Sequence, residues 1–163
     1  MRIGVISDTH IPDRAAKIPA QVLEAFRGVD LILHAGDLVD SDVLTELKTV
    51  CKDVRAVRGN MDHPHVQQSL PEKQVIDMEN HRIGMVHGHG APNRLIELVS
   101  KIFEKDKVDI IIFGHSHSPV NEKREGILYF NPGSPTEKIF SPYNSYGILE
   151  ITPEKVEAKI IKI

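Results

Sequence analysis

Short apolar runs alternate with segments of helical spacing in the first two thirds of the chain, and this alternation constrains the fold more than any other feature. Apolar runs occupy residues 2–6, 30–33, 54–57 and 108–113. Between them, apolar residues recur at helical intervals after Pro19, which can open a helix, after Ser41, which can cap one, and after Pro92. The pattern predicts successive βαβ units on a parallel sheet.

The helical pattern disappears after Gly114. Apolar runs at residues 127–130, 146–151 and 156–161 are separated there by turn residues. We expect these runs to form a second, mainly antiparallel sheet. The predicted fold class is α/β, a sandwich of two facing mixed β-sheets flanked by helices, and the length of 163 residues fits a single domain over residues 1–163.

Composition excludes several classes of function. A formal net charge of -3 gives no overall basic field, which argues against strong nucleic-acid binding. The longest unbroken apolar stretch covers only residues 110–113, far short of the roughly 20 residues that a membrane helix needs. Cys51 is the one cysteine, and the chain opens directly on an apolar run, so we expect a cytoplasmic protein without a disulfide or a membrane segment.

Side chains of metal-binding type stand just beyond four of these apolar runs and beyond a fifth run that ends at Val86. They are Asp8, His10, Asp37, Asn60, His87, His115 and His117. The carboxyl ends of parallel strands converge on one crevice, so these positions become neighbours. Residues two apart, such as Asp8 and His10, point to one side if the segment is extended. Seven donors exceed the about four to six positions of one ion and suit two ions that share a carboxylate.

Each cluster alone has an ordinary structural explanation. Asp8 could cap a turn, Asp37 could belong to a plain loop, Asn60 could supply left-handed backbone, and His87 could be a hydrogen-bonded structural residue. Independent structural needs would not place only metal-binding types at one strand end after another. The joint pattern therefore favours a metal centre.

These motifs, in the order Asp-x-His, Gly-Asp, Gly-Asn, His and Gly-His-x-His, resemble the calcineurin-like metallophosphoesterase superfamily over nearly the whole chain. The short length and the segments at residues 10–12 and 131–134 are similar to its small prokaryotic phosphodiesterase branch. The resemblance implies that Asp37 bridges two ions. The ligands of one ion would be Asp8, His10, Asp37 and His117, and those of the other Asp37, Asn60, His87 and His115.

The expected function is hydrolysis of small phosphodiesters by a metal-dependent phosphodiesterase. Two divalent ions bring four positive charges and two aspartates cancel two of them, so an anionic phosphoester is the natural guest. A hydroxide bridging the ions would attack phosphorus in line with the leaving oxygen. Imidazole-rich sites suit manganese, iron, zinc, nickel or cobalt, and the resemblance favours manganese.

The proton donor for the leaving group is open. In one widespread version of the family pattern a His follows the Gly-Asn pair, whereas Met61 and Asp62 follow it here, so Asp62 and His89 are the candidate substitutes. His34 either orients a metal ligand or is a satisfied residue at a strand end. The basic candidates for holding a substrate phosphate are Arg14, Lys17 and Arg58.

A non-catalytic alternative is a metal-binding scaffold for protein partners. Retromer subunits share this branch of the family, and in them the metal site tends to be degraded, whereas here Asp37 and all four histidine ligands are intact. The intact set favours catalysis. A homo-oligomer is our expectation for the assembly, although no motif specifies an interface.

Overall fold

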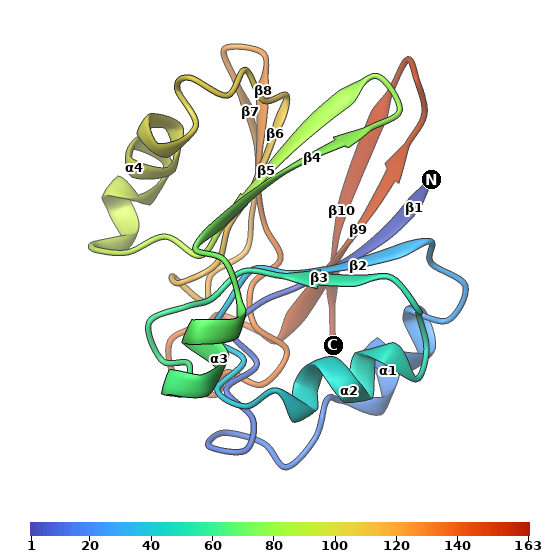
Figure 1. Cartoon of the computed structure of the whole chain (residues 1–163), viewed down its shortest axis with the longest axis vertical. Coiled ribbons are helices and arrows are strands. Elements are labelled where there is room, and N and C mark those ends of the chain that lie inside the picture. Colours follow the sequence, from blue (N-terminus) through green and yellow to red (C-terminus); the bar gives the residue numbers. More distant parts are fainter.

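The computed structural model describes residues 1–163, whose strands form two five-stranded mixed sheets (Figure 1). The first sheet has the order β10 (Val156–Lys162), β9 (Ser145–Ile151), β1 (Arg2–Ile6), β2 (Leu31–His34) and β3 (Val54–Ala56). The second has the order β4 (Lys73–Met78), β5 (His81–Val86), β6 (Ile110–Ile112), β8 (Ile127–Asn131) and β7 (Val120–Arg124). The predicted α/β sandwich is confirmed.

Each sheet combines parallel and antiparallel strand pairs. β1, β2 and β3 run parallel, while β9 pairs antiparallel with β1 and with β10. In the second sheet β6 runs parallel to β5 and β8, while β4 and β7 are antiparallel edge strands. Five parallel strands, β1, β2, β3, β5 and β6, end in the loops that carry the candidate ligands.

The central strands are apolar throughout because both of their faces are covered. On β1, Ile3 and Val5 face the second sheet, whereas Ile6 packs toward the helices. The layer between the sheets is one core cluster that includes Leu33, Met85 and other fully buried side chains. Period-two alternation thus divides each buried run between two cores.

Four α-helices and one short 3-10 helix accompany the sheets: α1 (Ala20–Ala25), α2 (Asp42–Lys48), α3 (Pro64–Ser69), α4 (Leu95–Ile102) and the 3-10 helix η1 (Pro92–Arg94). Helices α1 and α2 lie on the outer side of the first sheet and bury Val22, Val43 and Leu47. Helix α4 buries Leu95 and Val99 against the outer face of the second sheet, as Figure 1 shows.

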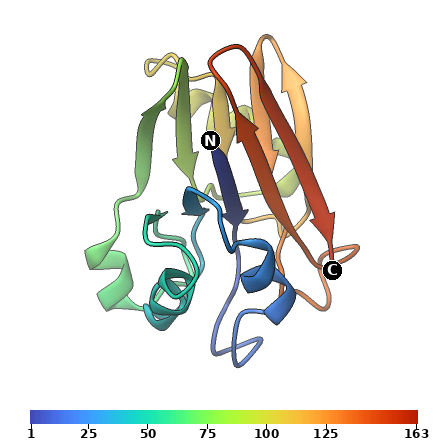
Figure 2. The same cartoon turned by 90° about the vertical axis from the view of Figure 1, so that its right-hand side faces the viewer.

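The allocation of strands to sheets differs from the prediction. β9 lies beside β1 in the first sheet and β10 lies beside β9 at its edge (Figure 2), whereas β6 belongs to the second sheet. The β4–β5 hairpin and α3 were not predicted. Apolar periodicity identifies strands but not their partners, and β4 exposes alternate residues, so it carries little apolar signal. No helix of this chain is long and apolar enough to cross a bilayer.

Candidate metal centre

The structure brings all seven predicted donor side chains to the carboxyl ends of the parallel strands. Asp8 and His10 follow β1, Asp37 follows β2 and Asn60 follows β3. From the second sheet, His87 follows β5, while His115 and His117 follow β6. Hydrogen bonds from Asp8 N to Gly36 O and from Gly114 N to His87 O tie these loops together.

The loops reach the centre through left-handed backbone. Asp8, His10, Asp37, His115 and His117 have φ values of 54°, 43°, 56°, 68° and 56°. Such residues cost on the order of 1 kcal/mol or more each and persist where the surrounding structure holds them, most often at functional sites. Asp8 and His10 do reach one site. The prediction that they lie on an extended segment is wrong, because both residues have positive φ values.

One cluster contains four buried residues. Its members, each offering one ligand atom within 4.8 Å of all the others, are Asp8, His10, Asp37 and His117. His117 Nε2 lies 3.2 Å from Asp8 Oδ1, and His10 Nε2 lies 3.6 Å from Asp37 Oδ2. The two Nε2 atoms are 3.2 Å apart. Two carboxylates and two imidazoles converging in this way fit a divalent ion.

The other three donor side chains contact Asp37 or one another. His87 Nε2 is 3.2 Å from Asp37 Oδ2, and His115 Nδ1 is 3.2 Å from Asn60 Oδ1. The rings of His87 and His115 stand edge to face, with centroids 5.4 Å apart. Asp37 Oδ2 therefore contacts a member of each group, as a shared carboxylate would.

Hydrogen bonds select which nitrogen of each ring faces the centre. The Ala35 carbonyl accepts from His87 Nδ1 (2.8 Å), and the Gly90 carbonyl accepts from His115 Nε2 (3.0 Å). His87 Nε2 is buried and has no hydrogen-bond partner, because its approach to Asp37 lacks hydrogen-bond geometry. A buried nitrogen that faces carboxylates and has no hydrogen-bond partner fits a metal ligand.

Close approach of the loops leaves room only for glycine beside the two aspartates. A Cβ on Gly59 would lie 2.1 Å from Asp37 Oδ1, and a Cβ on Gly114 would lie 2.6 Å from Asp8 Oδ2. Neither residue can therefore be replaced without moving a carboxylate. In the Gly-Asn and Gly-His motifs the second residue supplies a donor side chain, and the glycine leaves room for a neighbouring aspartate carboxylate.

The metal-free centre is strongly coupled electrostatically. Burial by itself would raise the pKa of Asp8, but the charge of His87 and a hydrogen bond from His117 lower it to about 2. Burial would lower the pKa of His87, but Asp8 and Asp37 outweigh it and raise the pKa to about 9. The pKa of His117 is raised in the same way by Asp8 and Glu137 against the effect of burial. The carboxylates thus stabilise positive charge on the rings of His87 and His117, and they would stabilise a metal cation in the same way.

Asp62 ties two ligand loops together. Its Oδ1 accepts from the Val39 N–H (2.7 Å) and its Oδ2 from the Gly59 N–H (2.6 Å). The residue is 4% exposed, and burial raises the pKa of its carboxyl. With both oxygens engaged by backbone donors, Asp62 is placed to hold the loops of Asp37 and Asn60 in register. His89, by contrast, is exposed and lies beside His87.

Both ring nitrogens of His34 have hydrogen-bond partners, as expected for a structural residue at the end of a strand. Gly36 N–H donates to His34 Nδ1 (3.2 Å), so Nε2 carries the hydrogen and donates to Thr9 Oγ1 (3.1 Å). Burial lowers its pKa to about 3, which keeps the ring neutral. Its contacts are with the loops of Asp8 and Asp37 rather than with their carboxylates.

Glu137 is a residue that the sequence analysis missed. It lies in the loop after β8, and its side chain is fully buried against His117. Burial would raise the pKa of Glu137, but hydrogen bonds from the Ile139 and Phe140 backbone and from His117 lower it to about 2. The signal available in the sequence was the end of the run at 127–130. A parallel assignment of that run would have placed the following loop at the metal centre.

Two of the three predicted phosphate-binding cations are paired with carboxylates. Arg14 contacts Glu137, and its guanidinium stacks over Phe140 at 5.8 Å from the ring centroid. Arg58 donates to Glu72 Oε2 at 3.0 Å and to the Gln67 carbonyl at 3.3 Å. Lys17 lines a separate hollow with the start of α2.

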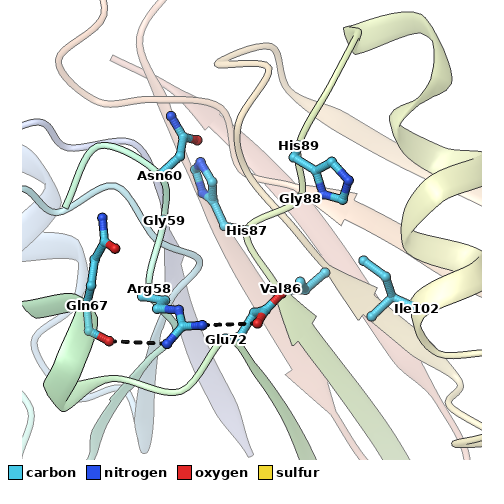
Figure 3. Close-up of a pocket in the computed structure, with 10 residues that line it drawn as sticks. All are labelled: Arg58, Gly59, Asn60, Gln67, Glu72, Val86, His87, Gly88, His89 and Ile102. Carbon is cyan, nitrogen blue, oxygen red and sulfur yellow. Dashed lines mark hydrogen bonds and ion pairs between the residues drawn. The ribbon is translucent and has the colours of Figure 1, made fainter.

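A pocket of about 240 Å³ opens beside the second group of donors (Figure 3). Asn60, His87 and His89 line one end, and Val86 and Ile102 form an apolar part of its wall. The Arg58–Glu72 pair lies along another side, where its opposite charges compensate each other. The pocket can take a neutral, partly polar group next to the metal centre.

The chain belongs to the calcineurin-like phosphoesterase superfamily, whose domain model matches residues 1–154. A "probable metallophosphoesterase" of Methanothermobacter thermautotrophicus is 44% identical over 163 residues, covering 99% of this chain and 92% of that protein. Members of this family typically bind divalent metals, and the clustered carboxylates and imidazoles form a candidate metal site. Family membership supports hydrolysis of phosphoesters.

Two solved structures share this fold. Vps29 from Entamoeba histolytica, in complex with Zn²⁺, has a TM-score of 0.80 and 28% identity and covers 99% of both chains. A novel archaeal phosphodiesterase has a TM-score of 0.77 and covers 99% of this chain and 100% of its own. Its 22% identity shows the fold alone.

Proposed function

We propose that the chain is a two-metal phosphodiesterase that hydrolyses small phosphodiesters. The observation that carries this proposal is the convergence of seven donor side chains, with Asp37 in contact with His10 and His87. Asp8, His10, Asp37 and His117 would hold one ion. Asp37, Asn60, His87 and His115 would hold the other. When bound, the ions would supply positive charge for the phosphoester and acidify the attacking water.

The donor chemistry supports manganese, iron, zinc, nickel or cobalt rather than magnesium or calcium, since four of the seven donors are imidazoles. Manganese is the metal that we propose, on the resemblance to the family. The Zn²⁺ complex of Vps29 from Entamoeba histolytica supports binding of a divalent ion by a protein of this fold.

A diester is favoured over a monoester by the charges around the centre. Once the attacking hydroxide is counted, two divalent ions and two aspartates leave about one net positive charge, which balances a diester but not a monoester dianion. A dianion would need an additional cation, but Arg14 and Arg58 are both committed to carboxylates. A diester carries one negative charge and a second substituent, and the pocket beside Asn60 and His87 has room for such a group. The compensated Arg58–Glu72 pair suits a neutral alcohol portion.

The residues of the chain would orient the substrate and handle the proton. Asn60 is exposed at the mouth of the pocket, where its amide can orient a phosphoryl oxygen. His89 is exposed on the same pocket, and we assign it the protonation of the leaving alkoxide. Asp62 is the less suitable donor because both of its oxygens accept backbone hydrogen bonds.

The test of the function is an assay of metal-free protein, reconstituted separately with each divalent metal, on a chromogenic diester and the matching monoester. We expect hydrolysis of the diester to exceed that of the monoester, with manganese among the activating metals. A folded, metal-loaded protein that cleaves neither substrate would contradict the proposal. It would favour the alternative of a metal-binding scaffold, which the likeness to Vps29 supports.

A leaving-group comparison tests the roles of His89 and Asp62. His89→Gln should lower hydrolysis of an alkyl diester by about 100-fold and change a nitrophenyl diester little, because nitrophenolate leaves without protonation. Asp62→Asn replaces one acceptor with a donor and should lower the free energy of unfolding by about 1–3 kcal/mol. Asp62→Asn should slow hydrolysis of both substrates equally. If Asp62→Asn alone lost hydrolysis of the alkyl diester and kept that of the nitrophenyl diester, Asp62 rather than His89 would be the proton donor.

A further inference from the structure

The contacts of Glu137 single it out among the buried polar side chains around the centre. Its side chain is fully buried, and the two carboxylate oxygens have different partners. Oε1 accepts from the backbone N–H groups of Lys138, Ile139 and Phe140, at 2.9, 2.7 and 3.1 Å. Three converging donors fix this atom as an acceptor, because no N–H group can stand in its place.

The second oxygen faces His117. Oε2 lies 2.5 Å from His117 Nδ1 and also accepts from Arg14. Nδ1 of His117 therefore carries a hydrogen and donates it to Glu137. The opposite nitrogen, Nε2, faces Asp8 Oδ1 at 3.2 Å and His10 Nε2 at 3.2 Å. A ring held in this tautomer presents its Nε2 lone pair to an ion whenever that nitrogen is unprotonated.

We propose that Glu137 is a positioning residue that fixes the His117 tautomer needed for metal binding. This inference rests on the proposed metal-dependent function, since His117 matters only if it binds an ion. Arg14 contributes by holding the same oxygen and by stacking on Phe140, the end of the turn that supplies the N–H groups. The loop after β8 thereby orients a ligand without touching the ion or the substrate.

The geometry predicts that Gln is a worse replacement than Asp. In Glu137→Gln the amide oxygen must occupy the cradle of three N–H groups, which turns the NH₂ group toward His117 Nδ1. That group can only donate, so His117 Nδ1 becomes an acceptor and Nε2 carries the hydrogen. Glu137→Asp keeps two acceptor oxygens and loses only reach. A role in shape or packing alone predicts the reverse order, because Gln has nearly the same size as Glu.

The experiment measures Zn²⁺ affinity of the full chain by competition with a chelating dye. The tautomer of His117 is read by ¹⁵N NMR of the metal-free protein at a pH where the ring is neutral, because a metal on Nε2 would itself fix the hydrogen on Nδ1. We expect Glu137→Gln to weaken binding at this site by about 10–100-fold and to lose the Nδ1 hydrogen. Glu137→Asp should show a smaller loss and keep that hydrogen. Glu24→Gln, in an exposed pair with Arg27, should match the wild type.

Separate outcomes overturn the two proposals. If Glu137→Gln bound Zn²⁺ with wild-type affinity and kept the hydrogen on Nδ1, the role of Glu137 would be wrong while the metal site stood. The same conclusion would follow if Glu137→Asp were the weaker binder of the two. If the wild type itself bound no Zn²⁺ at His117, the proposed function and this inference would both fail. Thermal unfolding of the metal-free variants shows whether each one is folded.

Discussion

Asp37→Asn should lower diester hydrolysis by at least about 1000-fold, which corresponds to about 4 kcal/mol of transition-state stabilisation. Asp37 Oδ2 faces His10 at 3.6 Å and His87 at 3.2 Å, so one carboxylate serves both proposed ions. An amide has no charge with which to balance two cations. Activity and metal content measured on the same sample should therefore fall together.

Asp40→Asn provides a matched control three residues along the chain. The Asp40 side chain is 33% exposed, and it accepts hydrogen bonds from Ser41 and Asp42 outside the centre. This variant should keep its metal and its activity. The bridging role of Asp37 would be wrong if Asp37→Asn retained both ions and stayed within about tenfold of the wild-type rate, a difference of about 1.4 kcal/mol.

Acid should weaken metal binding steeply. In the metal-free protein the pKa of His87 is raised to about 9, and that of His117 is also raised, because neighbouring carboxylates outweigh the effect of burial. Below these pKa values each ring holds a proton that an ion must displace. Each displaced proton makes affinity fall about tenfold per pH unit, so lowering the pH from about 8 to about 5 should weaken binding of the ion held by His87 by about 1000-fold. Binding of the ion held by His117 should weaken in the same direction.

Calorimetric titration in buffers of different ionisation enthalpy counts the protons released as Mn²⁺ binds. We expect release near neutral pH, and at fixed metal concentration we expect activity to fall together with metal content between roughly pH 6 and 5. Histidine ligation would be contradicted if metal content and activity stayed constant down to about pH 4, well below the ordinary histidine pKa.

The fold class could be predicted from the sequence, and so could the seven donors that come together, because both depend on local signals. Apolar runs indicate buried strands, and residues of metal-ligand type just past Ile6, His34 or Ile112 must lie at a strand end. The sequence was insufficient for assigning strands to sheets. Pairing of β9 with β1 is a long-range choice that depends on packing of both sheets and leaves no local pattern.

The supporting contacts around the donors could not be predicted for a similar reason. Glu137 is separated from its partner His117 by 20 residues, and nothing in the local sequence marks it as buried. Asp62 follows the Gly-Asn motif, which makes it a candidate proton donor, and its contacts with two backbone N–H groups cannot be read from that motif. Motifs identify which residue types come together, whereas the choice between ligand, support and acid depends on hydrogen-bond geometry.

Anomalous diffraction from crystals of the Mn²⁺-loaded protein tests the two-ion centre most directly. The account predicts two manganese peaks on either side of Asp37. One should lie among Asp8, His10 and His117, and the other among Asn60, His87 and His115. A single peak, or manganese bound elsewhere with these side chains unengaged, would contradict it.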